Sequence, residues 1–404
     1  MRPLALLAAF LLAACSSVTP TPTAGPSAAA SPLTTPARTP APATATPAPT
    51  TTLSGDAFGR SLPADTVARL EGVLASAMEG DPLISISAAV LVPGVGYWEY
   101  AAGLADRENE VAATPDTAYA IGGITHTFVA ALVLRLVEDG YLDLDDPAAD
   151  HLGPLGGEKS NGATVEELLG HRSGIGSYYH DLDFDRPWTL EELLANVGAP
   201  EFHSGGQYSE YSPTNYLLLG TIAEVVTGGP LGQLLHEYLL NPLGLERTYY
   251  TFGESVEEPI AHGYDGLEPP LVDVNDGSGQ IPFANAASIS RGNGAMASTA
   301  PDLVRWMEAL CAGELLGTDL HQQMFTFGGG DPSGGQGLGV IQVNLANSAS
   351  NVRGHYGGDF GYGGFAFCQE ETGTIAVVLT TPGLRDPSTT LELLYAAASH
   401  AYSD

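Results

Sequence analysis

Residues 120–147 read Ala-Ile-Gly-Gly-Ile-Thr-His-Thr-Phe-Val-Ala-Ala-Leu-Val-Leu-Arg-Leu-Val-Glu-Asp-Gly-Tyr-Leu-Asp-Leu-Asp-Asp-Pro, and this stretch decides how the rest of the chain is interpreted. The run from 125 to 139 is strongly apolar and long enough for a helix. Gly140 follows it directly, and a glycine at that place is a typical helix stop. The sequence therefore predicts one long apolar helix in the first half of the chain.

Strand-like runs lie toward both ends of the chain, and helical patterns lie between them. A helical stripe at 63–78 precedes two strand-like runs, 84–92 and 96–102, which Pro93-Gly94 joins as a hairpin. Further helices are expected at 164–169, 190–197, 214–226, 231–240, 300–312 and 388–402, and further strands at 338–345, 362–369 and 374–381. This order predicts an α/β (α+β) fold, in which an antiparallel sheet built from both chain ends is flanked by helices and carries an inserted, mostly helical region.

The composition indicates an acidic protein with an ordinary core. Hydrophobic residues make up 44% of the chain, whereas 14 Lys and Arg stand against 47 Asp and Glu, giving a formal net charge of −33. Such a field repels nucleic acid, so nucleic-acid partners are not expected. Of the three cysteines, Cys311 and Cys368 could pair in an oxidising compartment, but spacing alone leaves this open.

The N-terminus has the pattern of an export signal. Residues 1–14 contain Arg2 and a short apolar run that ends at Leu12-Ala-Ala-Cys15. This resembles a bacterial lipoprotein signal, in which the cysteine is acylated and becomes the new N-terminus. The alternative is ordinary secretory cleavage beside an incidental cysteine. The expectation is a lipid anchor at Cys15 on the extracytoplasmic face of the cell membrane.

A low-complexity segment separates this signal from the globular body. Residues 15–54 are mostly Pro, Thr, Ala and Ser and have no apolar periodicity, so they cannot bury a core. We expect a disordered tether here and one globular domain over residues 55–404.

Several motifs follow one another in the body. They are residues 120–128 with 140–147, the run Thr164-Val-Glu-Glu-Leu-Leu-Gly-His-Arg-Ser-Gly-Ile175, Tyr211-Ser-Pro-Thr-Asn-Tyr-Leu-Leu-Leu-Gly220, Asn241-Pro-Leu-Gly-Leu245, Ser298-Thr299 with Asp302-Leu303, and Gly354-His-Tyr-Gly-Gly358. In this order and spacing they resemble the serine β-lactamase and D-alanyl-D-alanine carboxypeptidase family, which includes penicillin-binding proteins and class C β-lactamases. The resemblance runs from about residue 60 to the C-terminus.

The resemblance implies a particular acyl-transfer site. In this family a Ser at a helix N-terminus is the nucleophile, and a Lys one turn later takes its proton. A Tyr-x-Asn motif adds a phenol and an amide. A Lys/His-Ser/Thr-Gly motif on a strand places a cation and a hydroxyl over the substrate. Two backbone N–H groups form the oxyanion hole.

This chain departs from that pattern at its most reactive positions. Gly123 stands at the Ser position, His126 at the Lys position and Pro213 at the Asn position. No Ser-x-x-Lys occurs anywhere, because the only Lys, Lys159, has Gly156 three residues before it. In comparable enzymes, loss of the nucleophile alone costs on the order of 10⁶ in turnover. The sequence therefore predicts a degenerate acyl-transfer site.

Other parts of the pattern survive and could bind a ligand. Tyr211 keeps the second motif's phenol, and His355 and Gly357 keep the frame of the third, with Tyr356 at its hydroxyl position. The backbone N–H groups of Gly123 and Gly358 could form an anion site, lined by His126, Tyr211, His355 and Tyr356. The alternative is that these are ordinary cleft side chains left after the chemistry was lost. Neither a cofactor nor a metal is expected.

Three further features have simpler interpretations. Thr127 could be a nucleophile beside His126, but a Thr after the Lys position is usual in the resembled family, so packing is favoured. His171 belongs to a matched motif and is interpreted as structural. Asp181, Asp183 and Asp185 suggest a calcium loop only faintly, because Arg186 stands where the required Gly should be.

Three functions remain open at this point. The first is a silent binding module for a cell-wall peptide, a D-amino-acid terminus or another carboxylate ligand. The second is an active esterase, peptidase or β-lactamase-like hydrolase that uses Tyr211, His126 or His355 in a substituted site. The third is an interaction protein whose acidic surface meets a partner while the cleft is idle. The ligand and the oligomeric state are not predicted.

Overall fold

The computed structural model describes residues 58–80, 83–200, 204, 209–254, 256, 260–265, 271–274, 283–331, 334–345, 351–384 and 386–402. The expected signal segment (1–14) and tether (15–54) lie outside the described residues. All the structure below therefore belongs to the expected globular body.

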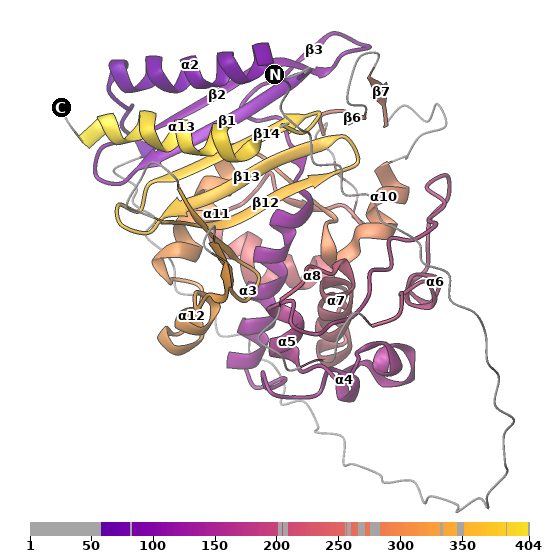
Figure 1. Cartoon of the computed structure of the whole chain (residues 1–404). Coiled ribbons are helices and arrows are strands. Elements are labelled where there is room, and N and C mark those ends of the chain that lie inside the picture. The colour runs from indigo at the N-terminus through magenta and orange to yellow at the C-terminus, as the bar shows by residue number, and fades with distance from the viewer. Residues whose placement is uncertain are drawn as a thin grey trace, which may run out of the picture. The chain divides into compact units, whose positions relative to one another are not determined.

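Strands from both ends of the chain form one antiparallel sheet (Figure 1). Within it, β1 (Ser85–Val92) pairs with β14 (Ile375–Thr381) on one side and with β2 (Gly96–Asp106) on the other. The order across the sheet is β3-β2-β1-β14-β13-β12-β11-β10-β9, with β3 (Val111–Ala112), β13 (Tyr362–Gln369), β12 (Asn351–Asp359), β11 (Ile341–Asn344), β10 (Gly334–Gln336) and β9 (Gly328–Asp331). The predicted antiparallel sheet from both chain ends is confirmed.

The buried strand β1 explains why the sheet is covered on both faces. All eight of its residues are buried, and successive side chains alternate between the faces. Ile86, Ala88 and Val90 pack in one apolar cluster with α2 (Ala64–Gly80) and α13 (Pro387–Ser399). These two helices lie over the same face of the sheet in Figure 1. The terminal helices therefore close one side of the sheet with mainly apolar contacts.

The opposite face of the sheet packs on the helical region. Here α3 (Thr125–Glu138) is the predicted long apolar helix, and α11 (Ala300–Ala312) lies beside it, with Phe128 stacked on Trp306 at a ring-centroid distance of 3.9 Å. The other helices are α4 (Ala148–Gly156), α5 (Val165–Leu169), α6 (Leu190–Ala195), α7 (Pro213–Thr227), α8 (Leu231–Leu235), α9 (Asn241–Leu243), α10 (Phe283–Ser290) and α12 (Thr318–Met324).

Short strands and helical turns complete the described part. The short strands are β4 (Tyr119–Ala120), β8 (Met296–Ser298) and β5 (Tyr249–Tyr250), which form one small sheet, and β6 (Tyr264–Asp265) and β7 (Val272–Asp273), which form another. The short helical turns are η1 (Gly122–Ile124), η2 (Gly157–Lys159), η3 (His236–Leu240), η4 (Arg291–Asn293) and η5 (His400–Tyr402).

A disulfide joins the two layers. Cys311 in α11 is bonded to Cys368 in β13, across 57 residues of chain. The pairing that cysteine spacing left open is therefore present, and it fixes the helix that carries Trp306 to the sheet.

Several elements differ from those expected: α4, α10, α12, β9 and β10 were not predicted, and the strand expected at 338–345 is limited to β11. The helix predicted at 231–240 ends as α8 and continues as the wider turn η3. The strand β12 was not among the expected strands, because Asn351-Val-Arg-Gly-His-Tyr-Gly-Gly-Asp359 is rich in glycine and polar residues, which have low strand propensity. It forms because it pairs in register with β13 from Val352 to Asp359 and with β11 on its other side. The third motif therefore lies on a strand next to α3.

No single described helix is both long and apolar enough to cross a bilayer, and one bent pair, α7 with residues 231–243, meets that test by length and composition.

Candidate ligand cleft at the start of helix α3

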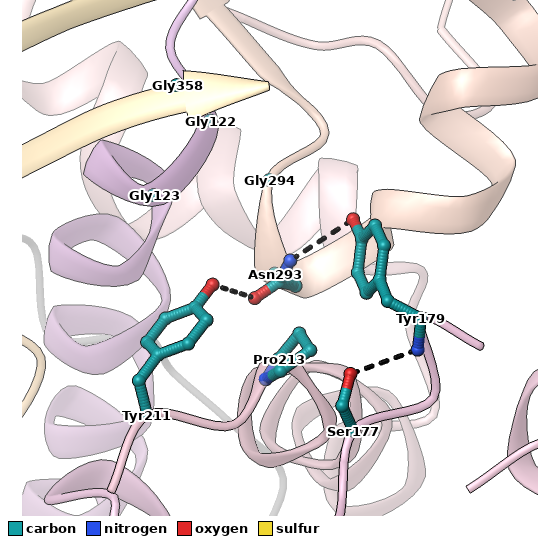
Figure 2. A pocket seen from close by; sticks show the side chains of 9 residues that line it. All are labelled: Gly122, Gly123, Ser177, Tyr179, Tyr211, Pro213, Asn293, Gly294 and Gly358. Atoms are coloured by element: carbon teal, nitrogen blue, oxygen red, sulfur yellow. Dashed lines mark hydrogen bonds between the residues drawn. The ribbon is translucent and has the colours of Figure 1, made fainter. Parts of the chain in front are cut away.

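A cleft with a volume of about 290 Å³ opens where η1, β12, α7 and η4 meet. This is close to the lower end of the range of small-molecule pockets, roughly 300–1,000 Å³. Figure 2 shows the residues that line it, which are Gly122, Gly123, Ser177, Tyr179, Tyr211, Pro213, Asn293, Gly294 and Gly358. Four of these had been selected from the sequence, namely Gly123, Tyr211, Pro213 and Gly358.

Gly123 stands in the turn that leads into α3, and the space for a side chain there is already filled. A Cβ built on Gly123 would lie 2.9 Å from the carbonyl oxygen of Tyr356 and 3.2 Å from Cε1 of His355. Real Cβ atoms essentially never approach backbone atoms to below 3.0 Å. A residue with a side chain at 123 therefore requires β12 or the His355 ring to move.

His126 lies one turn into the structure from Gly123 and is fully buried. Its ring stacks on Tyr216 at a centroid distance of 3.8 Å, and its Nε2 is 3.0 Å from Oδ1 of Asn293. Because an amide oxygen only accepts, Nε2 carries the proton and Nδ1 is a bare acceptor. Among the described residues, no group donates to that Nδ1.

Two more histidines surround His126. Nδ1 of His171 accepts from the side-chain amide of Asn215 at 2.9 Å, which leaves the proton on Nε2. Nδ1 of His355 donates to the carbonyl oxygen of Tyr356. The ring centroids of His171 and His355 lie 5.5 Å and 4.9 Å from that of His126. The structure thus brings His126 and His355 together and adds His171. Neither His126 nor His355 is among the described residues that line the cleft, which corrects the prediction that both side chains line it; they lie buried behind its wall.

Burial keeps these histidines uncharged. It lowers the pKa of His171, with the nearby His355 ring adding to the effect, to about 3. Burial also lowers the pKa of His355 to about 4. The pKa of His126 falls well below its usual value because of burial and then because of its two histidine neighbours. At neutral pH all three side chains therefore act as neutral hydrogen-bonding groups.

Asn293 holds the floor of the cleft together, as Figure 2 shows. Its Oδ1 accepts from the hydroxyl of Tyr211 at 3.2 Å as well as from His126. Its Nδ2 makes one long contact, 3.5 Å, to the hydroxyl of Tyr179. Tyr211 itself is 58% exposed, so its ring forms an outer wall of the cleft. The arrangement turns the oxygen of the Asn293 amide inward and its NH₂ group toward Tyr179 and the cleft.

The side chain of Tyr356 does not reach this cleft, which corrects its placement among the binding residues. Successive residues of β12 point to opposite faces of the sheet, so Tyr356 faces away from His355. Its ring packs near Phe367 at 4.9 Å, and its hydroxyl lies 3.4 Å from Oγ of Ser388. Gly357 is not among the residues that line the cleft either, and it packs so closely on Ile121 that a Cβ there would collide with the Ile121 carbonyl oxygen.

The hydroxyl groups near the cleft have structural partners. Thr127 is fully buried, donates to the carbonyl oxygen of Ile124 at 2.8 Å and accepts from Nε1 of Trp306 at 2.8 Å. It is therefore a packing residue, as expected. Oγ of Ser177 lines the cleft and accepts from the backbone N–H of Tyr179 at 3.0 Å.

The acidic run at 181–185 has local partners. Oδ1 of Asp183 accepts from the backbone N–H of Asp185 at 3.0 Å. The Arg186 that replaces the expected glycine binds Glu192 at 2.9 Å. These contacts fit the interpretation of the run as a set of surface acids.

A separate polar cluster combines a histidine with carboxylates. Asp106, Glu108 and His262 place three potential metal-ligand atoms within 4.8 Å of one another. Nδ1 of His262 is also 2.7 Å from Asp273. Protein donors already satisfy the acids: Asn109 donates to Asp106, and Arg107 and Tyr264 donate to Glu108. Sequence motifs gave no indication of this cluster, because its members come from distant segments.

Sequence reasoning missed five cleft residues: Gly122, Ser177, Tyr179, Asn293 and Gly294. Of these, Asn293 has the clearest role in the geometry. Its only signal in the sequence is its place in Gly292-Asn-Gly294, a turn-forming run just before the matched Ser298-Thr299. Ser177 and Tyr179 lie in an irregular loop, where no periodicity indicates which side chains face inward.

Comparison with known proteins agrees with this architecture. The β-lactamase family model matches residues 70–399. The chain is 27% identical over 339 residues to esterase EstB of Burkholderia gladioli, covering 74% of this chain and 86% of that protein. Among solved structures, the D-stereospecific amidohydrolase from Streptomyces sp. superposes with a TM-score of 0.69 at 28% identity, covering 83% and 98% of the two chains.

A further solved structure shows the fold alone. The D-amino acid amidase from Ochrobactrum anthropi SV3, in complex with L-phenylalanine amide, superposes with a TM-score of 0.72 at 24% identity, covering 84% of this chain and 100% of that one. The family match, together with the sheet built from both chain ends and the cleft at the start of α3, shows that this chain belongs to the β-lactamase family.

Proposed function

We propose that this protein is a β-lactamase-family binding module, which holds a cell-wall peptide or a related acyl ligand in its cleft without acyl transfer. The observation that carries the proposal is the geometry at Gly123. The residue has no nucleophile, and the volume that a serine side chain would need is taken by the His355 ring and the Tyr356 carbonyl oxygen.

The hydrogen bonds of the cleft support the same proposal. A proton-handling group must face a base that can take its proton. Tyr211 and His126 both donate to the amide oxygen of Asn293, which is not a base at neutral pH. Their protons therefore hold a fixed architecture, and they are not directed at a reacting atom.

A second candidate is an active hydrolase with substituted chemistry. It is favoured by the relatives, which carry the names of an esterase and an amidohydrolase. In this case Tyr211 or His355 would activate water or a hydroxyl group, and changing either would abolish turnover.

The purified protein should be assayed with a chromogenic ester and a chromogenic β-lactam, and its thermal unfolding followed across a panel of muropeptides. We expect no turnover above the uncatalysed rate, because loss of the nucleophile costs on the order of 10⁶ in comparable enzymes. We expect at least one muropeptide to raise the melting temperature in a saturable way.

Variants separate the two candidates. Turnover that disappears in Tyr211→Phe or His355→Gln would establish the substituted hydrolase and end the binding-module proposal. An absence of both turnover and ligand-induced stabilisation would favour an interaction protein with an idle cleft. Its acidic surface should then retain a partner at low salt and release it as salt screens the contact.

The proposed location is the outer face of a bacterial membrane, through a lipid on Cys15. The support is the sequence Leu12-Ala-Ala-Cys15 after an apolar run. Changing Cys15 to Ser should move the protein from the membrane fraction to the soluble fraction of expressing cells. A variant that still sediments with membranes would contradict the anchor.

A further inference from the structure

We infer that the cleft selects a neutral ligand with a hydrogen-bond acceptor, such as an amide or ester group, and discriminates against a free carboxylate, with the side-chain NH₂ of Asn293 as the selecting donor. The inference rests on the proposed function and names its ligand class. It replaces the carboxylate terminus that the sequence suggested.

The described wall of the cleft carries no positive charge. Of the nine described residues that line it, four are glycines, and the others are Ser177, Tyr179, Tyr211, Pro213 and Asn293. None of these side chains carries a charge at neutral pH. A carboxylate entering this cleft would lose hydration and meet no cation among these nine residues, which is costly.

The nearest arginine in the sequence has other partners. Arg291 is two residues from Asn293, but its Nε donates to the carbonyl oxygen of Ser288 at 3.1 Å and its guanidinium to that of Trp188 at 3.2 Å. The same group lies 4.2 Å from the ring centroid of Phe252. These three contacts hold its charge among groups that do not line the cleft.

The three histidines do not supply the missing charge. They are buried, and burial lowers the pKa of His171 to about 3 and that of His355 to about 4. His126 presents its only proton to Asn293. Charging any of them at neutral pH would require the ligand to offset both the burial and the repulsion from the neighbouring rings.

Asn293 is fixed so that it offers a neutral donor. Two groups donate to its Oδ1, namely Tyr211 and His126, and both would lose their acceptor if the amide rotated by half a turn. Its Nδ2 therefore stays on the side of the cleft, where its contact among the described residues, to the hydroxyl of Tyr179, is 3.5 Å long, at the limit for a hydrogen bond. A carbonyl oxygen of a ligand would be a better acceptor for this NH₂ group than the Tyr179 hydroxyl at that distance.

The overall charge acts in the same direction. The chain carries a net charge of −33, so its field opposes the approach of an anion and leaves a neutral ligand unaffected. Two ligands that differ only in a terminal amide or carboxylate have nearly the same shape, so a difference in their affinity measures the effect of ligand charge.

The test uses N-acetyl-D-alanyl-D-alanine amide and the corresponding free acid, titrated into the purified protein by calorimetry at pH 7. We expect the amide to bind at least ten-fold more tightly than the acid. Asn293→Asp retains an oxygen for Tyr211 and His126 and replaces the NH₂ donor with a negatively charged acceptor oxygen, so it should weaken amide binding at least ten-fold.

Asn241→Asp is the matched control, because Asn241 is exposed, does not line the cleft and undergoes the same change of charge. It should leave amide binding unchanged. Equal or tighter binding of the acid, or no saturable binding of either compound, would overturn the ligand class. Release of ammonia or D-alanine during the titration would instead overturn the proposed function, and the ratio of KM values would then report the selectivity.

Discussion

The three histidines behind the cleft and His262 lie in opposite electrostatic surroundings. His126, His171 and His355 are buried against one another and against neutral groups. His262 is partly exposed and lies between carboxylates, with Asp273 at 2.7 Å and Asp106 at 3.8 Å. The cleft thus excludes charge from its histidines, whereas the cluster around His262 is arranged to tolerate a cation. The described residues that line the cleft are uncharged as well, and this is why the cleft should prefer neutral groups.

The largest effect should come from placing a permanent cation in each environment. His126→Lys would bury an ammonium group without a counter-charge, and we expect it to lower the free energy of unfolding by about 3–5 kcal/mol. His262→Lys would place the same group beside two carboxylates, and we expect a change below about 1 kcal/mol.

Urea unfolding of the two variants beside the unchanged protein measures both values. Similar losses of free energy of unfolding in His126→Lys and His262→Lys would contradict the proposed difference between the two electrostatic surroundings. His126→Lys also introduces the lysine that the resembled motif has at this position. Its cost would measure how poorly the present surroundings accommodate that lysine.

An intermediate effect is expected at Gly123, the residue that makes room for the His355 ring. Gly123→Ala would force its Cβ to within 2.9 Å of the Tyr356 carbonyl oxygen, and we expect a loss of about 1–3 kcal/mol in the free energy of unfolding. Gly72→Ala in helix α2 is the control, because nothing lies within 4 Å of that Cβ and alanine favours a helix by roughly 0.5–1 kcal/mol.

Combining Gly123→Ala with His355→Ala tests which neighbour fills the space. The double variant should recover part of the loss, because the ring contact at 3.2 Å is gone while the carbonyl contact remains. Strictly additive losses would show that His355 does not limit position 123.

A smaller effect is expected from pH. The pKa of His171 is about 3 in the folded protein and near 6.5 in an unfolded chain, so the unfolded chain binds more protons between these values. The free energy of unfolding should therefore fall as the pH is lowered from about 6.5, with a slope on the order of 1 kcal/mol per pH unit for each buried histidine.

Urea unfolding between pH 7 and pH 5 measures this slope before most carboxylates titrate. His171→Asn keeps an acceptor for the Asn215 amide and removes one titrating group, so its slope should be smaller than that of the unchanged protein. An unchanged slope would show that His171 does not contribute to the pH dependence.

The smallest effect on the free energy of unfolding is expected at Tyr356, which lies on the opposite face of β12 from His355. Tyr356→Phe removes one 3.4 Å contact to Ser388 and should change the free energy of unfolding by less than about 1 kcal/mol. Calorimetry should show the same affinity for the amide ligand as in the unchanged protein. A clear loss of affinity would place Tyr356 back among the binding residues.

The sequence predicted the sheet and most helices because their signals are local. The apolar run in α3 and the alternating or continuous apolar strands β1 and β14 are each defined by neighbouring residues. Strand β12 escaped prediction because its formation depends on pairing with β13, which is not visible in a glycine-rich segment.

The cleft was predictable only where motifs mark its residues. The resemblance led to Gly123, Tyr211, Pro213 and Gly358, which all line it. Asn293 could not be found in this way, because its role arises from contacts with His126 and Tyr211, residues 167 and 82 positions away. For the same reason the crowding at Gly123 is a property of the assembled fold and not of the sequence pattern.

The disulfide between α11 and β13 also has a consequence for labelling chemistry. The chain has three cysteines, and Cys311 and Cys368 are consumed by their mutual bond. Cys15 is therefore the only cysteine left to carry a thiol. A maleimide reagent applied to the denatured, unreduced protein would add one label to a full-length chain with unmodified Cys15 and none once that sulfur carries a lipid. Because the disulfide blocks the other two cysteines, the number of labels found by intact mass measurement would show whether the sulfur of Cys15 is free or carries a lipid.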